Sequence, residues 1–285
     1  MTNGHGDHWG AIEGDAKASV AELFPAVVQK GKLDGQSFFD CPQDNGGTIR
    51  EKVFGLMLGH LPLRFMALVI TNSAAKTNEV ASGYPFCAEG VSNMVKVLSI
   101  KPWEGNIEAV IEVETKGGAS LCFFDPHFYK TKDMWRVGQD YEISLAALAM
   151  RLQQPSRNEF QVTGGPLLEL DRQRALEDDP KADVSKITSV TVTLRNLCYC
   201  VPNEDYPDEA EYRGVAEEVG YFETEGRGFF RIKTTLIKAD DNPVSAYVYA
   251  SESVLKGYRP QVSDSLEGWL WMQGWLARPI EKQES

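Results

Sequence analysis

Hydrophobic and polar residues alternate along most of the chain after Val91. Alternation with period two is typical of strands, because it sends neighbouring side chains to opposite faces of a sheet. A Lys116-Gly117-Gly118 turn between two such runs indicates a hairpin. The C-terminal two thirds of the chain is therefore predicted to be mainly β, with strands over 107–114, 120–124, 190–195 and 230–237.

The first 90 residues mix helical and strand patterns. Ser19 and Glu22 have the spacing of a capping box, and the apolar residues around them recur at helical spacing, so a short helix is expected there. A second helical run is expected from Ile49 onward, followed by a buried strand over 65–71. The predicted fold class is thus mainly β with a mixed α/β N-terminal region over residues 1–90.

The composition is that of a soluble globular protein. Apolar residues make up 42% of the 285 residues and charged residues 25%, so the chain can bury a core without disulfide staples. The five cysteines are odd in number and lie mostly inside apolar runs, which favours a reducing compartment. The N-terminus lacks a signal-peptide pattern, and the longest apolar region, 53–70, is interrupted by Gly, His, Pro and Arg residues. We therefore expect a cytoplasmic protein without a membrane span.

Most of the negative charge is concentrated in one stretch of the chain. The formal net charge is -12, and residues 166–225 account for -9 of it, with 6 basic and 15 acidic residues. Prolines accompany the acidic clusters, which is typical of a linker or a long loop. Two interpretations are open for this stretch: a solvated loop that keeps the protein soluble, or an acidic arm that attracts a basic partner.

The chain resembles itself at an offset of 125 residues. This offset aligns 119–152 with 244–277 without a gap, and each segment begins with a strand after a turn and ends in a second apolar strand. In both segments a connector with an aromatic residue joins the two strands. The identical positions are Ser120/Ser245, Val137/Val262, Glu142/Glu267 and Leu145/Leu270.

The repeated segment resembles the middle of an OB-fold, a small five-stranded barrel in which the third strand feeds a connector and a Val-Gly pair often opens the fourth strand. The stretch from Phe123 through the Val137-Gly138 pair carries the resemblance, whereas the second copy has Ser263 where the pattern has Gly. The resemblance implies two OB-like barrels in tandem, over 91–165 and 166–285.

The expected strands of the two barrels can be placed further. In the first copy 160–162 is expected to be the closing strand. In the second copy the first strand is expected over 187–194, followed by a long acidic insertion over about 196–226. No obvious closing strand follows Ala277 in the second copy.

The segment from Gly268 to Leu276 is the most informative for function. As a strand it places Trp269, Trp271, Gln273 and Trp275 on one face. Aromatic faces of this kind offer flat surfaces for bases or sugars, but aromatic residues equally fill cores and subunit interfaces. Both interpretations are open. The remaining members of the candidate ligand-binding set are two tyrosines and two cations on the neighbouring predicted strands, Tyr247, Tyr249, Arg231 and Lys233.

Signatures of catalysis and metal binding are few. His5 and His8 could hold a metal, but a terminal segment of this composition is typically disordered. Cys198 and Cys200 lack the C-x-x-C spacing of zinc sites, so these two cysteines are interpreted as core residues. Asp125 and His127 lie close together without an accompanying nucleophile at a sharp turn. Neither a P-loop nor a dinucleotide-binding glycine motif occurs in the sequence. We expect no cofactor and no metal.

Three functions are compatible with these patterns. The first is a non-catalytic protein that binds an extended ligand on the aromatic face, and the resemblance implies single-stranded nucleic acid as that ligand. The second is a protein-interaction or assembly factor that uses the acidic segment to attract a partner. The third is an enzyme whose active site is assembled from distant residues, which leave no spacing to detect in the sequence.

Overall fold

The computed structural model describes residues 7–42, 47–72, 76–103, 105–238 and 242–277. Strands contain 54% of the residues and helices 18%, which confirms a mainly β fold. Two sheets dominate, one of four strands and one of nine. Within the described part, no helix is long and apolar enough to cross a lipid bilayer.

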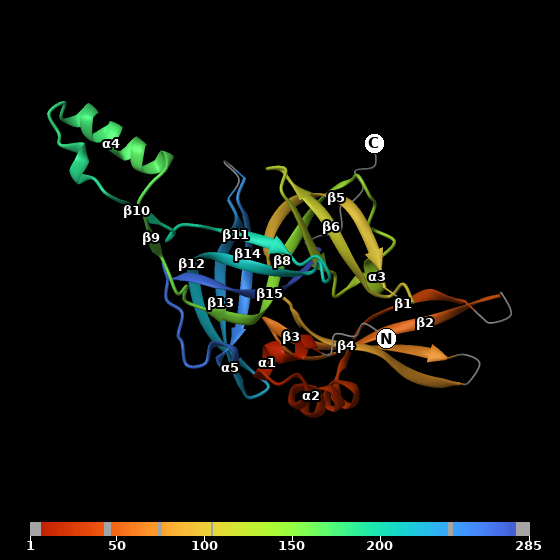
Figure 1. Ribbon diagram of the computed structural model, residues 1–285. Helices are drawn as coiled ribbons and strands as arrows, with labels where there is room; N and C mark the ends of the chain where they lie inside the picture. The colour runs from red at the N-terminus through yellow and green to blue at the C-terminus, as the bar shows by residue number, and fades with distance from the viewer. Residues whose placement is uncertain (1–6, 43–46, 73–75, 104, 239–241, 278–285) are drawn as a thin grey trace.

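The N-terminal region contains short helices and a four-stranded antiparallel sheet that projects from the rest of the molecule (Figure 1). The strand expected over 65–71 is confirmed as part of the third strand of this sheet. The elements in chain order are η1 (Asp7–Trp9), α1 (Gly10–Glu13), α2 (Ala16–Lys30), β1 (Lys32–Pro42), β2 (Thr48–His60), β3 (Leu63–Asn72) and β4 (Thr77–Cys87).

Two details of the N-terminal prediction are wrong. The residues after Ile49 form strand β2 and not a helix, because their burial alternates with period two and Val53 faces the core. Helix α2 begins three residues before Ser19, where the carboxylate of Asp15 caps it by accepting hydrogen bonds from Lys17 N at 2.9 Å and Ala18 N at 3.2 Å. Ser19 lies inside the helix, and its hydroxyl donates to Asp15 O.

The nine-stranded sheet closes on itself through additional pairings of β12 with β15 and of β8 with β5. These pairings define two rings of five strands, β5-β6-β7-β15-β8 and β12-β13-β14-β8-β15, and the pair β8–β15 belongs to both rings. The strands are β5 (Val91–Pro102), β6 (Ala109–Thr115), β7 (Ser120–Phe124), β8 (Asp140–Gln153), β11 (Tyr199–Pro202), β12 (Glu209–Thr224), β13 (Arg227–Ile237), β14 (Val244–Ser251) and β15 (Ser265–Leu276), with α3 (Phe128–Thr131) before β8 and α5 (Glu252–Leu255) before β15.

The register of the two rings repeats at the offset found in the sequence. Tyr249 pairs in parallel with Leu148, and Phe124 pairs in parallel with Gln273, which are the same positions 125 residues apart. Each ring is therefore closed by a strand from the other half of the chain. This exchange explains why the sequence after β15 offers no closing strand for the second copy.

Two strand assignments in the proposed copies are wrong. Strand β9 (Glu159–Val162) does not close the first ring, since it pairs with β10 (Val190–Thr193) in a separate two-stranded ribbon. The first strand of the second ring is β12, which lies inside the segment expected to be an acidic insertion. Acidic residues on the exposed side of β12 gave this segment a loop-like composition, whereas its other side buries residues such as Tyr212.

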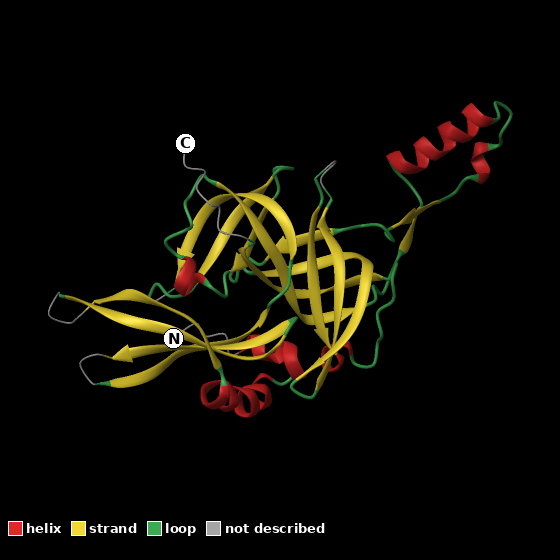
Figure 2. Cartoon of the chain, turned by 180° about the vertical axis from the view of Figure 1, so that it is seen from behind, coloured by secondary structure: helices red, strands yellow, loops and turns green. Residues whose placement is uncertain are grey.

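The core has two parts. One fills the rings with aliphatic and aromatic side chains, and the other lies between the outer surface of the rings and the N-terminal region. The ribbon β9–β10, together with α4 (Pro166–Asp178) and η2 (Val184–Lys186), forms an arm that stands away from the body in both views (Figures 1 and 2). Of the helix α4 side chains, only Leu168 is buried.

Candidate functional site

The N-terminal region covers the centre of the predicted aromatic face. Trp271 is fully buried, its ring stacks on His8 with centroids 4.0 Å apart, and its indole N–H donates to Asp208 Oδ2 at 2.8 Å. Gln273 is also fully buried, where its side chain accepts from Cys87 N and donates to Pro85 O. In this structure these two side chains are core residues and present no surface to a ligand.

Trp269 and Trp275 lie half-buried at the edges of the covered region. Trp269 donates its indole N–H to Glu209 Oε2 at 2.6 Å, and the other carboxylate oxygen lies 3.0 Å from His8 Nε2. Burial opposes ionisation of Glu209, but the hydrogen bonds from His8 and Trp269 outweigh it and lower the pKa of this carboxyl. Asp208 and Glu209, which lie in the expected acidic insertion, are therefore structural.

Strands β13 and β14 keep part of the predicted set accessible. Tyr247, Arg231 and Lys233 are half-exposed on the outer surface of the second ring, and the Arg231 guanidinium lies 4.8 Å from the centroid of the Tyr247 ring. Lys233 is directly opposite Tyr247 in the strand register. Tyr249, two residues further along β14, is buried and donates its hydroxyl to Glu89 O at 2.9 Å.

Each cation of this outer row has an acidic partner. Arg231 forms an ion pair with Glu89, and Lys233 with Glu218 at 2.9 Å. The side chains in the first pair are 36% and 37% exposed, and those in the second 32% and 58%. Pairs this exposed contribute little to the free energy of folding, because solvent screens the two charges.

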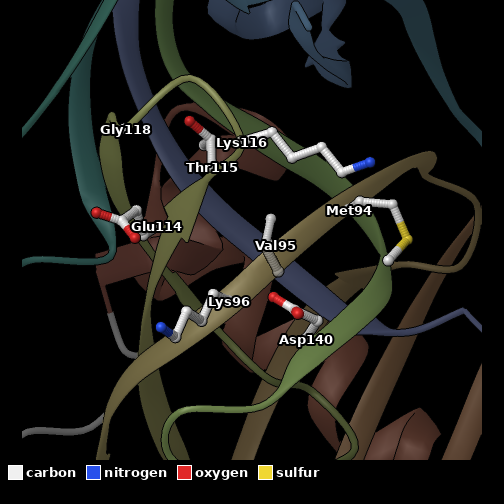
Figure 3. A pocket seen from close by; sticks show the side chains of 8 residues that line it. All are labelled: Met94, Val95, Lys96, Glu114, Thr115, Lys116, Gly118 and Asp140. Carbon is white, nitrogen blue, oxygen red and sulfur yellow. The ribbon is translucent and has the colours of Figure 1, made fainter.

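A hollow of about 530 Å³ lies on the outer surface of the first ring (Figure 3). Lys96 is directly opposite both Glu114 of β6 and Asp140 of β8, and Figure 3 shows the Lys116 side chain extending toward Met94. The two cations and two carboxylates balance in formal charge. The lining residues are Met94, Val95, Lys96, Glu114, Thr115, Lys116, Gly118 and Asp140.

A second hollow of about 250 Å³ continues the first toward the β13–β14 turn and shares Met94, Thr115 and Lys116 with it. Asn93 lines this second hollow and joins the two rings, because its amide nitrogen donates to Ser245 O at 2.9 Å and its oxygen accepts from Ser245 N at 3.1 Å. Ser245 and Tyr247 lie on the same face of β14, two residues apart.

The pair Asp125 and His127, considered for catalysis, has a structural role. Asp125 is buried and accepts hydrogen bonds from His127 N, Thr131 Oγ1 and Trp135 Nε1, which together order α3. Burial raises the pKa of Asp125. His127 Nδ1 lies 3.6 Å from Asp34 of β1, so the cluster attaches α3 to the N-terminal sheet.

Among the residues that the structure describes, no group of three or more His, Cys, Asp or Glu side chains could hold a metal ion. His5 lies outside the described residues. All five cysteines are free, and burial raises the pKa of Cys122 to about 11 and of Cys200 to about 12, so these thiols stay protonated at neutral pH.

No protein-family model, curated protein or solved structure matches the chain.

The joint at Asn93 and the hollow at Met94, Lys96 and Lys116 were missed by the sequence analysis. The exposed residues of β5 are Ser92, Met94, Lys96 and Leu98. They mix polar and apolar side chains, so their pattern in the sequence does not indicate a joint or a hollow. Their proximity to β14 follows from the exchange of strands, which the sequence does not encode in any local spacing.

Proposed function

We propose that this protein binds single-stranded nucleic acid without catalysis, through two interlocked OB-like barrels. The observation that carries the proposal is the half-exposed row of Tyr247, Arg231 and Lys233 on the second and third strands of the second ring. This part of an OB-fold is the one that binds oligonucleotides.

The topology of the rings supports the OB-like assignment. In each ring three consecutive strands form an antiparallel meander, and the third strand feeds a connector that contains a short helix, α3 or α5. The fourth strand, β8 or β15, follows that helix. The departure from a simple tandem arrangement is that each fifth strand comes from the other half of the chain.

The chemistry of the row suits a single strand. The ring of Tyr247 offers a flat surface on which a base can stack, at about 1 to 3 kcal/mol per base. Arg231 and Lys233 can neutralise phosphates once they exchange their carboxylate partners. The hollows of the first ring hold two further cations, Lys96 and Lys116, beside Glu114 and Asp140.

The test is fluorescence anisotropy of labelled single-stranded DNA and RNA at low and physiological salt. Tyr247→Ala combined with Arg231→Gln is expected to weaken binding at least tenfold. Tyr206→Ala is the matched control, because Tyr206 is 53% exposed and lies outside the row. Salt-independent binding, or equal affinity of the double variant and the control, would contradict the proposal.

A protein-interaction role is the second candidate, and the arm favours it. Leu167 and Leu170 of α4 are 49% and 50% exposed, on a helix whose main contacts are with β10 and η2 of its own arm. Leu194 N donates to Asn158 O at 2.7 Å at the base of the ribbon, so 159–193 can be replaced by a short turn. This deletion should abolish capture of a protein partner and leave nucleic-acid affinity unchanged.

A further inference from the structure

We propose that the four-stranded N-terminal sheet carries a second base-stacking platform for single-stranded nucleic acid, centred on Phe38 of β1. This inference rests on the proposed function, but it assigns a separate surface to it. Phe38 is 45% exposed, whereas the next residue, Phe39, is buried, so β1 has one packed face and one open face.

The open face combines an aromatic ring with two cations. Lys52 of β2 is directly opposite Phe38, and Arg50 is directly opposite Asp40, so all four side chains share one face of the sheet. The Arg50 guanidinium lies 5.0 Å from the centroid of the Phe38 ring. This contact places the cation over one face of the ring, and the Phe38 side chain remains 45% exposed to solvent.

Within the described part of the chain, Phe38, Asp40 and Arg50 on this face are exposed to solvent. Helix α2 ends at Lys30, and the neighbouring Gly31 lies so close to Leu56 of β2 that an added Cβ would be 3.2 Å from the Leu56 Cβ. Phe54, Lys52 and Arg50 continue the same face toward the tip of the hairpin, and Phe54 is half-buried. The sheet tip projects from the body in both views (Figures 1 and 2).

Helix α3 of the first ring adds a further cation at the edge of the sheet. Lys132 Nζ donates to Phe38 O at 2.6 Å, while Lys130 is paired with Asp34 at 2.5 Å. Three cations, Arg50, Lys52 and Lys132, therefore lie around Phe38, compared with one carboxylate, Asp40, on the same face. In a chain with a net charge of -12, this is a locally basic surface.

The arrangement fits unpaired bases. Open faces of antiparallel sheets that present aromatic rings bind single strands by stacking successive bases, with cations on the phosphates. A duplex offers no free base to stack on Phe38. The ligand class is therefore single-stranded nucleic acid, contacted at a surface distinct from Tyr247 on β14.

Photocrosslinking with bromouracil-substituted single-stranded DNA, followed by peptide mapping, tests the platform in the full chain. We expect crosslinks to the peptide that contains Phe38. In anisotropy titrations Phe38→Ala should weaken binding by about 5- to 100-fold, as expected for one lost base stack, and Phe38→Trp should retain it. Leu33→Ala is the control, because Leu33 is 62% exposed on the same strand and lacks a ring.

The outcomes separate this inference from the proposed function. The second platform alone would be overturned by three results together: the Tyr247 variant loses affinity, Phe38→Ala keeps its affinity, and no crosslink forms at Phe38. Absence of binding by the unmodified protein would overturn both proposals. Thermal unfolding of Phe38→Ala should match that of the unmodified protein, so that reduced binding is not a result of misfolding.

Discussion

Ala147 of β8 lies directly opposite Met272 of β15, and the two positions are 125 residues apart. They are therefore equivalent positions of the internal repeat, facing each other at the centre of the strand pair that both rings share. On one side of this point β8 pairs with β5 of the first ring, and on the other side it pairs with β14 of the second ring. In the same way β15 pairs first with β12 of the second ring and then with β7 of the first ring. The two halves of the chain are interlocked and cannot be separated into two complete rings.

Cutting the chain in the arm tests this interlocking. Residues 1–179 and 180–285, produced separately, each lack the strand that closes one ring, so we expect neither fragment to unfold cooperatively by itself. Co-production should restore a stable complex, because the cut falls in the arm, away from both rings. Circular dichroism melts and size-exclusion chromatography measure both results. A cooperative melt of either fragment alone would contradict the shared-strand architecture.

The sequence was sufficient to predict the mainly β character of the fold. Alternation along β6, β13 and β14 predicted strands that the structure confirms, because their inward and outward residues differ in polarity. The offset of 125 predicted the equivalence of β8 and β15 that the register also displays. The exchange of closing strands was not predictable, since pairing partners so far apart in sequence leave no local pattern.

The candidate site was predicted only in part. Period two correctly placed Trp271 and Gln273 on one face of β15, but periodicity does not show which face another segment will cover. Here η1 and β4 cover it, through His8 and the backbone at Cys87. Tyr247, Arg231 and Lys233 stay half-exposed, although Tyr247 packs against the edge of this second core and Arg231 pairs with Glu89.

Trp271→Ala should therefore destabilise the protein rather than act as a selective probe of binding. The buried indole leaves a large cavity, and Asp208 loses its hydrogen bond, so the free energy of unfolding should fall by about 3 to 5 kcal/mol. Urea titrations measure this change. Tyr221→Ala, at a side chain that is 50% exposed, should lower the free energy of unfolding much less than Trp271→Ala does. Equal stability of Trp271→Ala and the parent would show that the face is open in solution.

Gly268 allows β15 to approach β8 closely. A Cβ at this position would lie 2.0 Å from the carbonyl oxygen of Arg151, and a backbone atom cannot move aside as a side chain can. Gly268→Ala should lower the free energy of unfolding by about 1 to 3 kcal/mol or more. Gly220→Ala is the matched control within a strand, because its Cβ would meet no atom within 4 Å. Similar melting temperatures for the two variants would argue against this contact between the shared strands.

Asp34 should make the attachment of the N-terminal sheet to α3 sensitive to acid. Burial opposes its ionisation, but hydrogen bonds from Tyr129 and Lys130 and the proximity of His127 outweigh burial and lower its pKa. A carboxyl with a lowered folded-state pKa stabilises the fold above its unfolded pKa of about 3.9, and this contribution is lost as the pH falls through the folded-state pKa.

The melting temperature of Asp34→Asn, compared with the parent from pH 7 to pH 3, tests this linkage. The variant should melt at a lower temperature at pH 7, and the difference should begin to narrow as the pH falls below about 4, because the unfolded parent then binds a proton at Asp34 while the folded parent still holds the carboxylate ionised. Asp40→Asn, on the same strand and exposed to solvent, serves as the control. A difference between Asp34→Asn and the parent that stays constant over this range would mean that hydrogen-bond geometry, and not the charge of Asp34, holds β1 against α3.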